Sequence, residues 1–297
     1  MNAAVNTEMS AAPNAAPTTE RNAALSAEQV NQYQRDGFVF PLRAISADTA
    51  TQYRRALEKY EASTGKPLAG KYKHKVHLLF TWASELVHNQ TILDAVQGII
   101  GPDILCWTTN FFIKEPESAG FVSWHQDSTY WGLDGDDVVT AWVALSEASI
   151  ESGCMAFMPG SHKVDQLPHL DTFHRDNLLS RGQEIAVEVD QSKAVLAPLA
   201  TGEMSLHHIK LVHGSKPNQS RDRRIGLAIR YIPTRVRQTK VRDAATLVRG
   251  VDQYHHFDLE PRPLADMDQA AVAAHIDSIR RQAKSLYSGS GKKDFGE

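Results

Sequence analysis

Cysteines and long apolar runs are scarce in this chain of 297 residues. The two cysteines, Cys106 and Cys154, stand 48 residues apart, which excludes a disulfide scaffold and a Cys-x-x-Cys zinc or redox motif. No run of about 18 apolar residues could span a bilayer, and the N-terminus lacks the basic start and apolar core of a secretory signal. These absences predict a cytoplasmic protein with no membrane partner.

A basic excess is missing as well. The 32 Lys and Arg residues stand against 35 Asp and Glu residues, which gives a net charge of -3. A protein that binds DNA or RNA needs Lys and Arg to neutralise phosphates, so this balance excludes nucleic acid as the main partner. With 42% apolar residues the chain can bury a substantial core, and we expect a small-molecule substrate, with the oligomeric state left open.

Large apolar side chains are nearly absent from residues 1–24, which therefore cannot offset the entropy of ordering. We expect a disordered tail there, followed by a single domain over residues 25–290. This domain consists of a helical N-terminal part at 25–103, a β-rich core at 104–235 and a C-terminal helix at 266–288.

Capping residues mark the helices of the N-terminal part. Ser26 and Gln29 form a capping-box pattern at the start of a helix that Gly37 ends. Ser46 can cap a second helix that extends to residue 63. The other elements expected before the core are a strand at 38–42 and a helix at 91–99.

Two segments lack helix or strand periodicity. Residues 65–77 carry four lysines and two histidines, so they form either a solvated basic loop or a lid that meets an anionic substrate. Residues 163–183 interrupt the β-rich core, and we interpret them as either an insertion or a second lid.

Short β-rich runs broken by turn residues dominate the chain from Ile104 onward. They predict a sandwich or barrel, so the fold class expected is mainly β with flanking helices. The runs expected to be strands are 104–114, 138–145, 154–158, 185–189, 194–199, 204–208 and 225–232.

The segment FVSWHQDSTYW at 121–131 carries two candidate metal ligands. In an extended chain the side chains of His125 and Asp127 point to the same side, so one imidazole and one carboxylate could bind one ion. A His-x-Asp pattern is weak evidence on its own because it is short. The site therefore needs a third ligand from elsewhere in the chain.

That third ligand is expected from His213, at which a strand runs into a turn holding residues 213–215. His207 and His208 lie nearby, but side chains alternate along a strand, so at most one of these two could face the ion. Two histidines and one aspartate leave adjacent coordination positions open, which is the arrangement of non-haem Fe(II) oxygenases.

Such an oxygenase needs an electron donor, and a dicarboxylate such as 2-oxoglutarate needs a cation for its far carboxylate. Arg suits this role because its planar fork makes two parallel charge-assisted hydrogen bonds. Arg224 opens an apolar strand eleven residues after His213, and Arg223 precedes it on the opposite face. One of the two is expected to point inward, and we interpret Arg223 as the surface residue.

Several motifs in this order resemble the phytanoyl-CoA dioxygenase-like (PhyH) branch of the Fe(II)/2-oxoglutarate-dependent dioxygenases. They span about residues 26–233 and are DGFVF, FFIKEP, WHQDSTYW, AWVALSEASIESGCMAFMPGSH and HGSKPNQSRDRRIGLAIRY. The resemblance implies a double-stranded β-helix, a jelly-roll, cupin-like core within one dioxygenase domain. It also implies Fe(II) as cofactor, 2-oxoglutarate as co-substrate and O2 as oxidant.

The resemblance further implies which residues form the site. Halogenating relatives carry Ala or Gly in place of the acid, so Asp127 indicates a hydroxylase and not a halogenase. The implied residues are His125, Asp127 and His213 as iron ligands, Arg224 and Ser215 for the far carboxylate of 2-oxoglutarate, and Thr108, Asn110 and Trp131 elsewhere around the cofactors.

Candidate substrate residues mix cations with aromatic rings, which favours a small polar or zwitterionic metabolite, such as an amino-acid derivative or an amino- or ammonium-phosphonate. An acyl-CoA substrate is an alternative within the family. A cupin-type metalloenzyme that uses no 2-oxoglutarate would not need an inward Arg224, and a ligand-binding jelly roll would bind no iron. The substrate residues expected are Lys73, His77, Tyr130 and Arg237.

Overall fold

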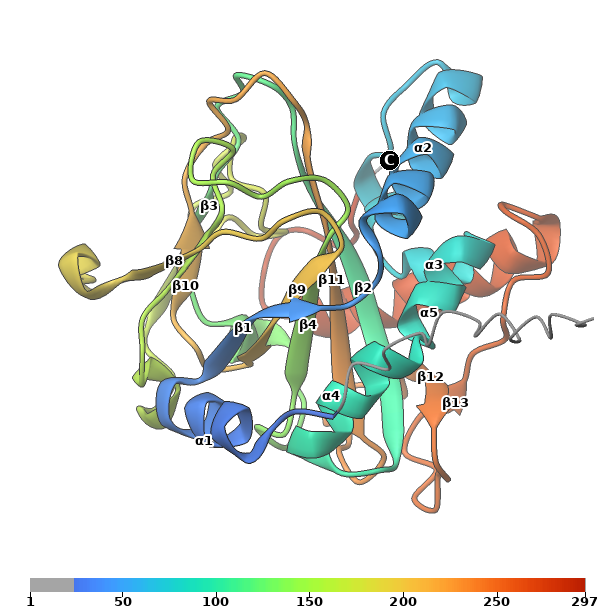
Figure 1. Ribbon diagram of the computed structural model, residues 1–297. Helices are drawn as coiled ribbons and strands as arrows, with labels where there is room; N and C mark the ends of the chain where they lie inside the picture. Colours follow the sequence, from blue (N-terminus) through green and yellow to red (C-terminus); the bar gives the residue numbers. More distant parts are fainter. Residues whose placement is uncertain (1–23, 297) are drawn as a thin grey trace, which may run out of the picture.

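Two β-sheets form the centre of the molecule (Figure 1). The computed structural model describes residues 24–296, so the predicted tail lies outside the described residues except for Ala24. The seven-stranded sheet has the order β1 (Phe38–Arg43), β9 (Glu203–His208), β4 (Val139–Ala144), β11 (Arg224–Pro233), β2 (Ile104–Lys114), β12 (Ala244–Arg249) and β13 (Asp258–Leu259). The four-stranded sheet has the order β3 (Val122–His125), β10 (His213–Ser215), β5 (Met155–Phe157) and β8 (Val195–Ala197). This arrangement confirms the predicted mainly β, jelly-roll fold.

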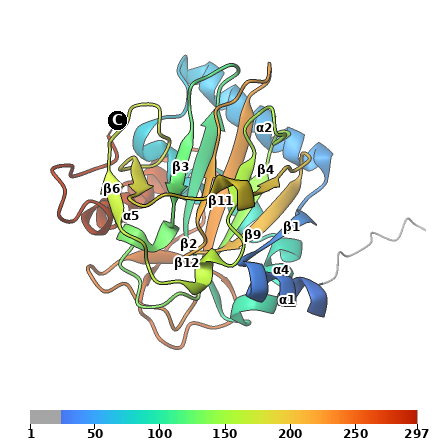
Figure 2. The ribbon, with the colours of Figure 1, turned by 90° about the vertical axis from the view of Figure 1, so that its left-hand side faces the viewer.

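The helices are α1 (Ala27–Asp36), α2 (Ala47–Thr64), α3 (Thr81–Val87), α4 (Gln90–Ile100) and α5 (Gln269–Leu286). Helices α2, α3 and α4 pack on the outer face of the seven-stranded sheet, away from the four-stranded sheet, whereas α1 lies beside β1 (Figures 1 and 2). The predicted capping box is confirmed, because Ser26 and Gln29 exchange side-chain to backbone hydrogen bonds at 2.9 and 3.2 Å. Gly37 ends this helix with φ 87°, a conformation that glycine adopts without strain.

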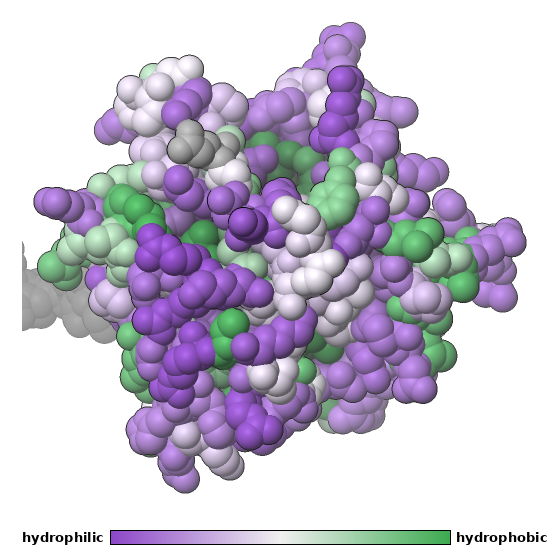
Figure 3. All heavy atoms as spheres, turned by 180° about the vertical axis from the view of Figure 1, so that it is seen from behind, coloured by the Kyte–Doolittle hydropathy of each residue, from purple (hydrophilic) through white to green (hydrophobic). Residues whose placement is uncertain are grey.

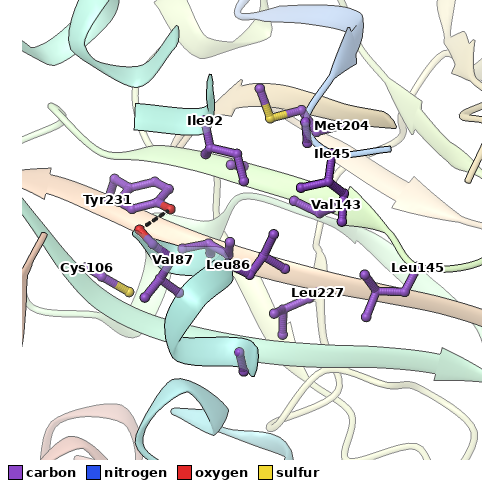
Figure 4. Packing of buried hydrophobic residues seen from close by; sticks show 14 of the residues in the cluster. Ile45, Leu86, Val87, Ile92, Cys106, Val143, Leu145, Met204, Leu227 and Tyr231 are labelled. Carbon is purple, nitrogen blue, oxygen red and sulfur yellow. Dashed lines mark hydrogen bonds between the residues drawn. The ribbon is translucent and has the colours of Figure 1, made fainter. Parts of the chain in front are cut away.

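Strand β11 shows how the sequence divides its side chains between two environments. The residues at alternate positions pack against the helices and carry large apolar side chains. Tyr231 belongs to this set, and its hydroxyl donates a hydrogen bond of 3.0 Å to the carbonyl of Val87 in α3 (Figure 4). The residues of the opposite set face the four-stranded sheet, and they are Arg224, Gly226, Ala228 and Arg230.

The predicted strands differ from the structure chiefly where a strand is very short. The turn predicted at 213–215 is wrong, because these residues form β10, which pairs with β3 on one side and β5 on the other. Three residues are too few to show an alternating pattern. The strand predicted at 185–189 is wrong beyond Ile185, where β7 (Gln183–Ile185) ends after pairing with β6 (His169–Asp171). Strands β12 and β13 lie outside the predicted runs.

The basic segment at 65–77 is exposed only in its first part, so the solvated-loop alternative is wrong for its second part. The lid alternative stays a prediction, and Lys73 and His74 line a cavity described below. The segment contains two short 3-10 helices, η1 (Gly70–Lys73) and η2 (Val76–Leu78), and Lys75 is fully buried. The Lys75 ammonium lies 2.6 Å from a carboxylate oxygen of Glu260, and His77 lies 3.3 Å from the other oxygen. The charge pattern misled the prediction because a paired lysine can be buried where an unpaired one cannot.

Charged and polar side chains cover much of the molecular surface. In the view from behind, hydrophobic residues appear in separate groups between hydrophilic ones (Figure 3). Within residues 24–296, no helix is both long enough and apolar enough to cross a membrane.

We predict that Lys75→Met destabilises the protein by about 3 kcal/mol or more, because it leaves the Glu260 carboxylate buried without its cation. Urea unfolding followed by circular dichroism measures this change. The matched control is Lys66→Met, an exposed lysine of the same segment, for which we expect a change within about 0.5 kcal/mol. Equal stability of the two variants would show that the buried pair contributes nothing.

Candidate active site

The three predicted metal ligands meet between the two sheets. His125 ends β3, and Asp127 follows at the start of the 3-10 helix η3 (Asp127–Tyr130). Strand β10 lies antiparallel to β3 with His213 opposite His125, so strand pairing brings the third side chain to the same place. One ligand atom from each residue lies within 4.8 Å of the other two, and all three residues are buried.

Backbone carbonyls orient the rings of both histidines. Nδ1 of His125 donates to the carbonyls of Ser123 and His213 at 2.9 and 3.1 Å. Nδ1 of His213 donates to the carbonyl of Leu211 at 2.9 Å. Nε2 of each ring is therefore free to face an ion, as in metal sites whose histidines are held by a second hydrogen bond. Burial, and then the His125 ring, lowers the pKa of His213 to about 3, so its ring stays neutral.

Asp127 contributes a carboxylate to the set. Its Oδ1 lies 3.5 Å from Nε2 of His125 and 3.7 Å from Nη2 of Arg230, and Thr140 donates to Oδ2 at 3.4 Å. Burial favours the neutral acid, but Arg230 and the two histidines outweigh it and hold the pKa of Asp127 well below its usual range. Two imidazoles and one carboxylate in a buried site fit a divalent iron ion with open positions.

A cavity of about 20 Å³ adjoins the two histidines, and Arg224 lines it. This arginine is 1% exposed, and its Nη1 donates to the carbonyl of Gly153 at 2.5 Å. Its guanidinium lies 5.2 Å from the centre of the Trp142 ring. Burial lowers the pKa of Arg224 to about 10, so it stays charged at neutral pH. Ser215 lines the same cavity, which places both predicted anchor residues together.

Arg223 points the other way, as alternation along the strand requires. Its guanidinium lies 2.8 Å from a carboxylate oxygen of Glu61 and 2.9 Å from one of Glu115. These carboxylates already neutralise it, so Arg224 is the arginine that remains available to a ligand.

A larger cavity of about 260 Å³ is lined by Asp127, and it shares Phe112 and Arg230 with the smaller one. Among its described lining residues, Asp127 is the only carboxylate, and the cations are Lys73, Arg175 and Arg230. Thr108, Asn110 and Trp131 line this cavity and not the smaller one, so a contact with 2-oxoglutarate stays a prediction for them.

Segments from outside the β core complete the larger cavity. Residues 175–183 of the predicted second lid line one part of it, and this segment contributes Arg175, Asn177, Leu178, Leu179, Ser180 and Gln183. Helix α5 and the residues after it contribute Gln282, Ser285, Leu286 and Phe295. The Phe295 ring lies 4.0 Å from that of His74, so the C-terminal segment reaches the wall of the cavity.

Of the four predicted substrate residues, Lys73 lines the larger cavity. The prediction for His77 is wrong, because its ring is held by Thr109 and Glu260 and lines neither cavity. The prediction for Arg237 is also wrong, since this side chain is 61% exposed and pairs with Asp134. Tyr130 lies under the Arg181 guanidinium at 3.8 Å and is absent from both linings.

Three residues of the site were missed, namely Lys114, Arg230 and Trp142. Lys114 and Arg230 could have been found from strand alternation, because each shares a strand face with a residue that was predicted, whereas β4, which carries Trp142, held no predicted site residue. His207 lies beside the ligands, with its ring centre 4.8 Å from that of His213, whereas His208 packs near His162. The alternation of side chains along a strand predicted correctly that these two histidines point to opposite faces, but it could not show which of them points toward the ligands.

The sequence model of the family "Phytanoyl-CoA dioxygenase (PhyH)" matches residues 25–226. This range includes all three ligands and Arg224. The chain belongs to this family.

Relatives of the chain extend over most of its length. A probable alpha-ketoglutarate-dependent hypophosphite dioxygenase of Stutzerimonas stutzeri is 31% identical over 209 residues, which are 69% of this chain and 71% of the relative. The solved structure titled "non-heme monooxygenase; ThoJ apo" superposes with a TM-score of 0.77 and 38% identity, over 87% of this chain and 97% of that one. An ectoine dioxygenase of Streptomyces coelicolor is 26% identical over 155 residues, 47% of this chain and 52% of the relative.

The PhyH protein is an Fe(II)/2-oxoglutarate-dependent dioxygenase with O2 as oxidant. Its family and relatives favour this activity over the cupin-type alternative without 2-oxoglutarate and over a ligand-binding jelly roll. When bound, the iron couples oxidative decarboxylation of 2-oxoglutarate to oxidation of the substrate. His125, Asp127 and His213 would hold it, and the presence of Asp127 agrees with a hydroxylase.

Asp127→Ala is expected to abolish substrate-dependent succinate formation, because it removes one ligand and leaves Arg230 without its carboxylate. Anaerobic Fe(II) titration should show weaker metal binding in the same variant. The control is Asp137→Ala, an exposed carboxylate paired with Arg235, which should bind iron like the wild type. Unchanged iron affinity in Asp127→Ala would remove this residue from the ligand set.

Arg224→Lys is expected to weaken 2-oxoglutarate binding by roughly tenfold to hundredfold, since a point charge cannot reproduce the guanidinium fork. The visible absorption band of the anaerobic Fe(II)–2-oxoglutarate complex measures the affinity. Arg223→Lys is the matched control, and its affinity should change by less than about twofold because this side chain faces Glu61 and Glu115. The reverse order of the two effects would make Arg223 the anchor.

Proposed function

We propose that the enzyme hydroxylates an unactivated C–H bond of a small polar or zwitterionic metabolite that carries an anionic group. Amino-acid derivatives and amino- or ammonium-phosphonates belong to this class. The observation that carries the proposal is the set of cations around the larger cavity, where the basic side chains of Lys73 and Arg230 lie with one carboxylate, that of Asp127. The third basic residue of the lining, Arg175, is mostly exposed and pairs with Asp176.

The size of the cavity supports a small substrate. About 260 Å³ is at or below the low end of the range for ligand pockets, which begins near roughly 300 Å³. The names of two relatives, a hypophosphite dioxygenase and an ectoine dioxygenase, also refer to small polar molecules.

Arg230 is the cation best placed to hold an anionic group near the iron. It is 5% exposed and lines both cavities, and its Nη1 donates to Asn110 at 2.8 Å. Its guanidinium lies 5.3 Å from the Trp131 ring, and that ring lies 5.0 Å from Trp107. The pair of indoles adds aromatic surface to the same cavity as the basic groups, and such surface can attract the cationic part of a zwitterion.

The rest of the chain would position the substrate and exclude water. The segment at 175–183 and the C-terminal residue Phe295 contribute to the wall of the larger cavity. Phe112 and Arg230 line both this cavity and the one that contains Arg224, so the two cavities adjoin at these side chains. The rate of hydroxylation would then depend on how closely these residues hold the reacting carbon of the substrate to the metal.

An acyl-CoA is the second candidate substrate, and one feature favours it. A groove of about 710 Å³ lies between α5 and the C-terminal segment and shares Phe295 with the larger cavity. Such a basic groove could bind the phosphates of coenzyme A next to the reaction site. Its basic residues are Lys71, Arg280, Lys284, Lys292 and Lys293.

Two lysine variants separate the candidates. With the substrate found by measuring succinate released from 2-oxoglutarate, Lys73→Met should raise KM by roughly tenfold or more for a small anion, because it removes a cation from the cavity. Lys284→Met, in the groove, should leave that KM unchanged.

The screen would include 2-aminoethylphosphonate, its N-trimethyl form, zwitterionic amino acids and medium-chain acyl-CoAs. Turnover of acyl-CoA alone, with KM raised by Lys284→Met and not by Lys73→Met, would reverse the proposal in favour of the second candidate. The proposal would also be contradicted if neither phosphonate and no amino acid in the screen increased the release of succinate.

A further inference from the structure

Lys114, the last residue of β2, is a second buried cation beside Arg224. The two residues are opposite each other in the β2–β11 register, and each is 1% exposed. Nζ of Lys114 lies 2.7 Å from Oγ of Ser215 and 3.2 Å from the carbonyl oxygen of Gly153, and it also contacts the carbonyl oxygen of Lys216. Arg224 donates to the same Gly153 carbonyl, so the two cations share one acceptor.

Neutral oxygens are the only partners that the described residues offer these two cations. The buried Lys75, by contrast, lies against the Glu260 carboxylate at 2.6 Å. A buried cation without a counter-charge is costly, and a pair of them costs more because they also repel. An anion that enters from outside would remove this cost, and the small cavity lined by Arg224 and Ser215 is where it would enter.

We propose that Lys114 is the second cation of the 2-oxoglutarate site and takes up a proton from solvent when the far carboxylate binds. Lys114 acts through Ser215, so it is a positioning residue. Once protonated, Nζ has a third N–H to donate to Oγ of Ser215, and this directs the hydroxyl proton into the cavity toward the carboxylate. The carboxylate then bonds directly to Arg224 and Ser215, with the Lys114 charge behind them.

The proton balance follows from the surroundings of Lys114. Burial, and then the charge of Arg224, lowers the pKa of Lys114 to about 6, so the amine is mostly neutral at pH 7.5 before the ligand binds. The other titratable group that faces it is Cys154, whose pKa burial raises, so its thiol stays neutral. A bound carboxylate favours the ammonium form and raises the pKa of Lys114, and one proton moves from solvent to Nζ.

Binding linked to proton uptake has a definite pH dependence. Between the pKa of Lys114 in the free protein and its pKa in the complex, the affinity for 2-oxoglutarate falls by about tenfold for each unit that the pH rises. Below that range Lys114 is already charged, and the affinity no longer depends on its titration.

Calorimetry in buffers of different ionisation enthalpy counts the protons. The anaerobic Fe(II)-loaded protein is titrated at pH 7.5 with 2-oxoglutarate and with 2-oxovalerate, which keeps the keto acid and lacks the far carboxylate. We expect nearly one more proton to be taken up with 2-oxoglutarate. Lys114→Met should remove this difference and flatten the pH dependence of Kd, whereas Trp142→Phe, beside Arg224, should weaken binding and keep the difference.

Two results would overturn the proposal. One is that the wild-type protein takes up the same number of protons with 2-oxoglutarate as with 2-oxovalerate. This result can be obtained without any variant. The other is a difference that persists in Lys114→Met. If that variant does not fold by circular dichroism, Lys114→Arg takes its place, because its permanent charge should also abolish the extra proton. No primary substrate enters these titrations, so their outcome is independent of the proposed function.

Discussion

Burial of every residue of β11 is the constraint on which the rest of the structure depends. A strand that is covered on both sides must present one set of side chains to the helices and the other to the second sheet. The side chains of β11 that face the helices are apolar. The other side holds Arg224 and Arg230, so the strand that anchors the core also supplies the two arginines of the site.

The two arginines of β11 have different partners in the space between the sheets. Arg230 lies 3.7 Å from Asp127 and keeps this carboxylate ionised among buried groups, while Arg224 lies farther along the same strand and has a neutral acceptor. One arginine therefore lies against the predicted metal ligand at the edge of the larger cavity, and the other lines the smaller cavity and has no carboxylate partner among the described residues. This separation explains why two cations on one strand face do not perform the same task.

Much of the fold and the metal site could be predicted from the sequence, because local signals carried them. Caps at Ser26 and Gly37, and alternation along β2 and β11, depend on neighbours in the chain. The failures involve distant partners. His77 looked available until Glu260, 183 residues away, was seen to bind it, and β10 is a strand only because β3 and β5 flank it. The residues near His77 and within β10 do not indicate these distant partners.

The wall of the larger cavity and the predicted iron site come from separate parts of the chain. Arg224 is the last of the predicted iron and 2-oxoglutarate residues in the sequence, and Phe295 follows it by 71 residues. A chain shortened before α5 would therefore keep all of these residues and lack the part of the cavity wall formed by α5 and Phe295. Its substrate cavity would be open to water on that side.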